Sequence, residues 1–167
     1  DGIFPMITSW MMNFYLLEAQ IALGVNTGKT DQVLLTNALN AQIDKVFAIG
    51  ATVGANIDPA TWTFPVKYKT KSTFVTDVVA AYPGAGTPAA KLQYAVKQAW
   101  FANHGNGFEI YNTFRRTGFP SDIQSPLQAP RQFALSLPYV QDEINLNPST
   151  PTKVYDSPAD AIFWDVI

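Results

Sequence analysis

The carboxylates near the C-terminal end of the chain are the residues best suited to hydrolytic chemistry. Asp142 and Glu143 are adjacent, and Asp156 and Asp160 follow close together. Glycoside hydrolysis uses two such groups about 5 to 10 Å apart across a cleft. Because adjacent side chains usually point in different directions, we favour a second interpretation, in which these acids form ion pairs with the chain's arginines.

His104 is the only histidine, and its side chain is the type that titrates near neutral pH. No serine follows a nucleophile-elbow pattern, and Glu109 is the only acid nearby in sequence. We therefore favour a hydrogen-bonding histidine at a helix end over a catalytic one. With no cysteine and one histidine, the chain lacks the ligands of most zinc sites, although a site with oxygen ligands stays open. No metal or cofactor is predicted.

Two short motifs have both a functional and a structural interpretation. The segment Gly105-Asn106-Gly107 resembles part of a phosphate loop, but the preceding strand and the remaining glycines of a dinucleotide fingerprint are missing. Close packing of two helices explains these glycines more simply. Arg115 and Arg116 have the geometry to grip an anionic ligand, or to tie the tail of the chain to the helices. We favour the structural anchor.

Four aromatic residues have no helical spacing that would explain them, and they lie in a long segment broken by prolines. They are Trp62, Phe64, Tyr68 and Tyr82. Flat rings with polar edges can stack on the apolar faces of sugars, while nearby amides and hydroxyls bond the sugar hydroxyls. The four residues are therefore the candidates for carbohydrate binding. The alternative, that they hold the loop against the core, stays open.

The composition is that of one globular domain with few charges. The chain has 167 residues, of which 47% are apolar and 14% are charged, against about 25% charged in an average soluble domain. We expect residues 1–167 to form a single domain. A net charge of −2 gives no electrostatic reason to bind nucleic acid.

The spacing of apolar residues predicts a mainly α-helical fold. Helices are expected at about 5–23, 31–49, 72–81, 88–103 and 108–114, followed by a proline-rich coil over 121–157. The first two form an antiparallel pair whose length, roughly 40 residues, is compatible with a tetratricopeptide-like unit. No second copy of that period is present.

The first predicted helix belongs to the most apolar stretch, Phe4 to Gly24. Glu18 would cost a few kcal/mol near the centre of a bilayer, so we expect a helix buried between other helices. Two apolar stripes indicate two neighbours for this helix. The stripes are Trp10, Phe14, Leu17 and Ile21 on one side, and Ile7, Met11 and Tyr15 on the other.

The block Ala99–Pro120 resembles a signature of the SusD/RagB-like nutrient-binding lipoproteins. It reads AWFANHGNGFEIYNTFRRTGFP, with the GNGFE form of the SusD-like subgroup followed by RRTG, an aromatic residue and proline. The residues of the motif are Trp100, Gly105, Gly107, Glu109, Arg115, Arg116 and Gly118.

Two further blocks resemble the same family in the same order. The stretch Phe4–Gly24 is similar to its PLMTYAE…FLLAEA…G helix. Pro130-Arg131, Leu137–Tyr139 and Glu143–Asn145 are similar to its PRR…YP…E…N tail. The chain departs from that tail at Gln132, where the family has a second arginine.

The resemblance implies that the chain is the C-terminal part of a longer protein, built as a partial α/α superhelix of tetratricopeptide-like pairs with long irregular loops. Such a protein is held at the outer face of a Gram-negative outer membrane by a lipid anchor that lies outside this chain. It binds an oligosaccharide or another nutrient without catalysing a reaction on it, and delivers it to a SusC-like TonB-dependent transporter. A helical-repeat scaffold for another protein is one alternative, and a glycoside hydrolase is another.

Overall fold

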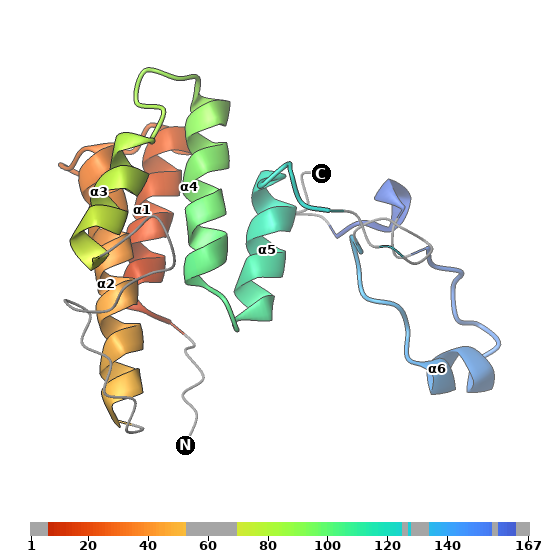
Figure 1. The fold of residues 1–167 in the computed structure, drawn as a ribbon. Coiled ribbons are helices and arrows are strands. Elements are labelled where there is room, and N and C mark those ends of the chain that lie inside the picture. The colour runs from red at the N-terminus through yellow and green to blue at the C-terminus, as the bar shows by residue number, and fades with distance from the viewer. Residues whose placement is uncertain (1–6, 53–69, 125–126, 128–133, 155–156, 163–167) are drawn as a thin grey trace. The chain divides into compact units, whose positions relative to one another are not determined.

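The computed structural model describes residues 7–52, 70–124, 127, 134–154 and 157–162. Within these ranges the chain forms six α-helices and a short 3₁₀-helix, with no β-strand (Figure 1). The prediction of a mainly α-helical fold is confirmed. In chain order the helices are α1 (Ser9–Leu23), α2 (Asp31–Thr52), α3 (Lys71–Ala80), α4 (Pro88–Ala102), α5 (Gly107–Thr117), α6 (Gln141–Leu146) and the 3₁₀-helix Pro158–Asp160. The chain falls into two compact units, Asp1–Ile110 and Tyr111–Ile167.

Capping residues set both ends of α1. Thr8 has an extended backbone, and its hydroxyl accepts a hydrogen bond from the Met11 N–H at 3.3 Å. Because Thr8 is the N-cap, the helix begins at Ser9, and the expected start near Pro5 is wrong. Gly24 ends the helix as expected, in the left-handed conformation with φ 68°.

Threonines also begin the next three helices. The hydroxyls of Thr30, Thr70 and Thr87 each accept a hydrogen bond from the backbone N–H three residues ahead, at 3.2 to 3.3 Å. Helix α2 continues past the predicted end at residue 49, and α5 is longer than predicted. Helix α6 lies in the segment predicted as coil, so that prediction is wrong for this short element.

In the first unit, α1 packs against both α2 and α4, and α3 packs against α2 (Figure 1). Leu17 of α1 and Leu34 and Leu35 of α2 are completely buried. The two neighbours expected from the stripes of α1 are therefore present. Ile7, placed in one of those stripes by its spacing, is instead 79% exposed because it precedes the helix.

Polar contacts show that α1 and α2 run antiparallel. Gln20, near the end of α1, donates a hydrogen bond to Asp31, the first residue of α2, at 2.5 Å. The connection between them holds Thr27, whose hydroxyl donates to Gln20 at 2.6 Å. None of the described helices has the length and apolar character that crossing a membrane requires.

We predict that the core of the first unit depends on the apolar contacts of α1. Leu17→Ala should lower the free energy of unfolding by about 2–5 kcal/mol, because it leaves a cavity in a fully buried position. Leu23→Ala on the same helix is the control, since Leu23 is 77% exposed and its loss should cost less than about 0.5 kcal/mol. Denaturant unfolding followed by circular dichroism measures both, and equal losses would contradict the assigned packing.

Candidate functional site

The turn between α4 and α5 is formed by Asn103, His104, Gly105 and Asn106. Asn103 ends α4, with its N–H donated to the Ala99 carbonyl at 2.9 Å, and its own carbonyl accepts from the Asn106 N–H at 2.8 Å. Gly105 lies between them at φ 90°, a conformation that side chains other than glycine rarely adopt. The Asn106 side chain then accepts from the Glu109 N–H at 3.2 Å and caps α5. We call residues 103–106 the joint.

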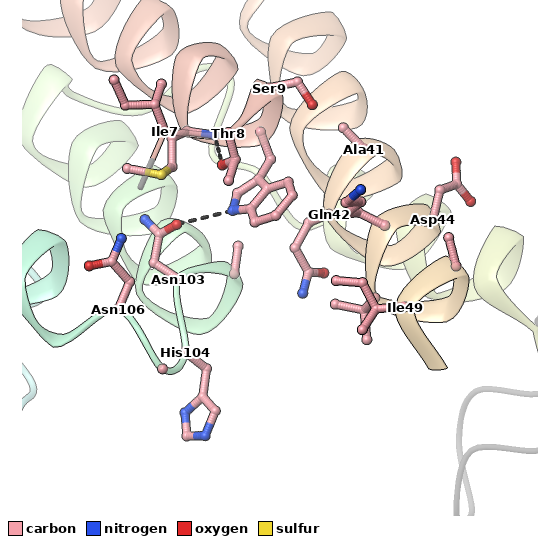
Figure 2. A pocket seen from close by; sticks show the side chains of 17 residues that line it. Ile7, Thr8, Ser9, Ala41, Gln42, Asp44, Ile49, Asn103, His104 and Asn106 are labelled. Carbon is pink, nitrogen blue, oxygen red and sulfur yellow. Dashed lines mark hydrogen bonds between the residues drawn. The ribbon is translucent and has the colours of Figure 1, made fainter. Parts of the chain in front are cut away.

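The joint is attached to the beginning of α1. The indole N–H of Trp10 donates to the side-chain oxygen of Asn103 at 3.1 Å, and both residues are buried (Figure 2). Because a buried indole N–H requires an acceptor, this bond holds together two segments that lie 93 positions apart in the chain.

A cleft of about 940 Å³ opens beside this bond. Its walls are the first turn of α1, the C-terminal half of α2 and the joint. Figure 2 shows Gln42 and Ile49 on the α2 side, with Asn103 and His104 on the side of the joint. The volume falls at the upper end of the range of about 300–1,000 Å³ found for small-molecule sites.

The wall residues supply both apolar surface and polar groups. Ile7 and Val46 are exposed apolar side chains at the cleft, and Ile49 is half-buried there. Gln42 contributes an amide, and Lys45 contributes a positive charge. Apolar lining with a few placed polar groups is the usual character of a site that holds a small molecule.

Asp44 is the acidic residue of the wall, and its charge is compensated from outside the cleft. The ammonium of Lys71 on α3 lies 2.5 Å from the Asp44 carboxylate. Figure 2 shows the Asp44 side chain directed away from Gln42 and Asn103. Among the described residues, no group of three or more histidine or acidic side chains is arranged to hold a metal ion.

The aromatic candidates for carbohydrate binding are only partly within the described residues. Trp62, Phe64 and Tyr68 lie outside them. Tyr82 follows α3 and is 5% exposed, with its ring edge-on to Tyr94 at a centroid distance of 5.9 Å. Little of the Tyr82 ring is therefore presented to a ligand.

Tyr82 belongs to a polar cluster around Asp31, at the end of the helices opposite the cleft. Its hydroxyl donates to the Asp31 carboxylate at 2.8 Å, and Lys91 of α4 lies 3.5 Å from the same oxygen. Gln20 completes the cluster through the other oxygen of Asp31. The cluster thus links α1, α2, α4 and the segment after α3.

The cluster shifts the pKa of both of its acids. Burial raises the pKa of the Asp31 carboxyl. The hydrogen bonds from Gln20 and Tyr82 and the charge of Lys91 together lower this pKa by a larger amount, so it lies below its ordinary value. Burial raises the pKa of the Tyr82 phenol, and its hydrogen bond to the negative Asp31 raises it more.

The arginines of the motif lie in the second unit, where they differ in environment. Arg115 is buried, donates to the Leu135 carbonyl and lies over the Tyr111 ring, 4.8 Å from its centroid. This contact ties the segment around residue 135 to α5. Arg116 is exposed and donates to the Thr113 hydroxyl at 3.4 Å.

The remaining motif residues have structural positions. Trp100 is half-buried on α4, and Gly107 and Glu109 form the first turn of α5. Gly118 follows α5 with φ 70° and donates to the Phe114 carbonyl at 2.7 Å. Arg131 lies outside the described residues.

The acids considered for hydrolysis have different surroundings. Asp142 and Glu143 are exposed on α6, and Glu143 accepts from the Asn147 amide at 2.6 Å. Asp160 accepts from the Val154 N–H at 2.7 Å. Asp156 lies outside the described residues.

Sequence reasoning missed the wall of α2 and the Asp31 cluster. Gln42, Lys45 and Ile49 carry no motif, and their position at the cleft depends on packing with α1 and the joint. The sequence indicates His104 and the glycines around it as notable residues, but it does not predict the bond between the neighbouring Asn103 and Trp10. The signal was the Asn-x-x-Asn spacing before a predicted helix, which is typical of a capped turn.

We predict that Asp31→Asn lowers the free energy of unfolding at pH 7 by about 1–3 kcal/mol, since it removes the charged acceptor of three contacts. Asp31 has a lowered pKa when folded, so its contribution is present above the ordinary value of 3.8 and is lost as the pH falls through the folded pKa. The difference between wild type and variant should therefore shrink below pH 3.8, which unfolding curves across acidic pH would measure.

Tyr82→Phe is the companion variant at alkaline pH. Because the folded pKa of Tyr82 is raised, its contribution is complete below the ordinary value of 10.0 and is lost as the pH rises above it. The variant should lack this alkaline loss of stability. Parallel curves for wild type and both variants at all pH values would refute the role of the cluster.

We predict that Trp10 and Asn103 are energetically coupled. Trp10→Phe and Asn103→Ala each leave one polar partner of a buried hydrogen bond unpaired. This unpaired group should lower the free energy of unfolding by about 1–3 kcal/mol. The double variant leaves neither unpaired, so it should be more stable than the sum of the single losses indicates, by about 1 kcal/mol. Denaturant unfolding of the four proteins gives this coupling, and strict additivity would argue against the bond.

Comparisons with protein-family models, with curated proteins and with solved structures find no match to this chain. The resemblance to the SusD/RagB-like family therefore rests on the sequence blocks themselves.

Proposed function

We propose that the chain is the C-terminal part of a cell-surface protein that binds an oligosaccharide or another nutrient without catalysing a reaction on it. In this proposal a lipid anchor elsewhere in the protein holds it at the outer membrane. A SusC-like TonB-dependent transporter receives the nutrient from it. The α1–α2 pair corresponds to a tetratricopeptide-like unit of a SusD-like superhelix.

One observation supports this proposal most: two of the blocks that resemble the family meet at one cleft. Ile7 and Thr8 come from the block at the start of the chain, and the joint comes from the block that contains GNGFE. The Trp10–Asn103 bond connects the same two blocks. Residues of the resemblance thus build part of the wall of a concave site.

The chemistry of the cleft also favours binding. Its polar side chains at Thr8 and Asn106 cap helices, and that of Asn103 accepts from the Trp10 indole, so they hold the wall in place. Gln42 and the apolar residues of α2 remain to contact a ligand. Walls fixed before the ligand arrives reduce the ordering cost of binding.

A protein-interaction scaffold is the second candidate, and a feature of α1 favours it. Met12, Leu16 and Leu23 follow helical spacing and are 49%, 40% and 77% exposed. An uncovered apolar stripe on a helix is a common feature of protein-binding surfaces. On this hypothesis the ligand of the chain is another protein, and the cleft has no cargo.

The proposal predicts binding of the intact protein to members of a glycan array, without release of shorter products. Substituting Gln42→Ala and Ile49→Ala together should weaken that binding about tenfold or more, because both contact residues lie in the cleft wall. Isothermal titration with the strongest array ligand gives the affinity. Chromatography of the ligand after incubation detects any cleavage.

A matched control separates the cleft from the α1 stripe. Met12→Ala with Leu16→Ala should leave glycan affinity unchanged on the nutrient-binding proposal. Failure to bind any glycan or peptide, together with failure to co-purify with a transporter, would overturn the proposal. Turnover that disappears in Asp142→Asn or Glu143→Gln would instead identify a hydrolase.

A further inference from the structure

We propose that the cleft selects an acidic oligosaccharide, one whose sugar units carry carboxylates, as uronic acids do. This inference rests on the proposed function and adds the chemical class of the ligand. It follows from the balance of charges at the wall and from the apolar and amide groups beside them.

The charges at the cleft leave a positive excess. Asp44 and Lys45 are neighbours on α2, and both line the cleft. The Asp44 carboxylate pairs with Lys71 of α3, which is not part of the wall. Lys45 takes part in neither of the ion pairs found among the described residues. An anionic ligand therefore meets a lysine whose attraction is not cancelled by the acid next to it.

The other groups of the wall suit a sugar better than a simple anion. Ile7 and Ile49 offer apolar surface to the C–H faces of a sugar ring. Gln42 has both a donor and an acceptor for hydroxyl groups. With about 940 Å³, the cleft has room for a short oligosaccharide.

The pairing of Asp44 with Lys71 contributes to selectivity. Without Lys71, the Asp44 carboxylate would stand uncompensated at the edge of the cleft and repel a ligand carboxylate. Lys71 is 25% exposed at its side chain, so its charge is held close to Asp44. We assign Lys71 as a positioning residue that acts through Asp44, and Lys45 as the residue that faces the ligand carboxylate.

The test compares a trimer of galacturonic acid with its fully methyl-esterified form, and a trimer of mannuronic acid with its ester. Each pair shares ring, linkage and stereochemistry, and differs in the methyl groups that remove the carboxylate charges. Titration calorimetry on the intact protein should show at least one acid form binding roughly two- to fivefold tighter than its ester, as expected for a partly exposed ion pair. The preference should decrease as salt increases.

Variants assign the preference to the named residues. Lys45→Met should remove the preference for the acid form, and Lys45→Arg should retain it. Lys71→Met should also weaken binding of the acid form, and adding Asp44→Asn should restore it. Lys29→Met is the matched control, since it removes the same charge from the loop at the other end of α1 and should have no effect.

The outcomes separate this inference from the proposed function. Equal binding of acid and ester, binding of neutral oligosaccharides alone, or a preference that survives Lys45→Met would overturn the inference and leave nutrient binding in place. Failure to bind any oligosaccharide, acidic or neutral, would overturn the inference, and it would overturn the proposed function as well only if the protein also fails to bind any peptide and to co-purify with a transporter.

Discussion

The hydrogen bond between Trp10 and Asn103 is the constraint on which the end of the first unit that contains the cleft depends. Asn103 ends α4, accepts from the indole and holds Asn106 through its carbonyl, and Asn106 then caps α5. One side chain thus fixes the beginning of α1 against the end of α4 and the start of α5. Loss of this bond leaves the buried Trp10 N–H without an acceptor, and the cleft wall loses a contact that fixes its geometry.

The first unit is held by polar contacts at both ends of an apolar core. At one end, Asp31 gathers Gln20, Tyr82 and Lys91. At the other end stands the Trp10–Asn103 bond, and Leu17 lies buried on α1 between the two. Burial of apolar side chains stabilises such a core but is not directional. The hydrogen bonds of the two polar groups are directional, so they determine which helix ends meet. The cleft lies at this second end, between the first turn of α1, the C-terminal half of α2 and the joint.

The sequence predicted local features well because their causes are local. Thr87 before Pro88 and the glycines at 24 and 118 fixed helix ends through capping and backbone conformation, which depend on a few neighbouring residues. The start of α1 was misplaced because Pro5 and Thr8 both carry helix-start signals, and only Thr8 caps the helix observed. The cleft and the Asp31 cluster join residues tens of positions apart, and no short pattern in one sequence encodes such pairs.

The structural roles of the motif residues bear on where the proposed nutrient binding would acquire its selectivity. Asn106, Gly105 and Gly118 serve turns and caps, and Arg115 holds the tail segment, so these positions are occupied by the demands of folding. A substitution at any of these positions that altered ligand preference would also disturb the helix to which the residue belongs. Gln42, Lys45 and Ile49 at the cleft cap no helix end, and the buried leucines of α2, such as Leu35 and Leu39, lie earlier in the same helix. Specificity can therefore vary along α2 while the joint stays the same.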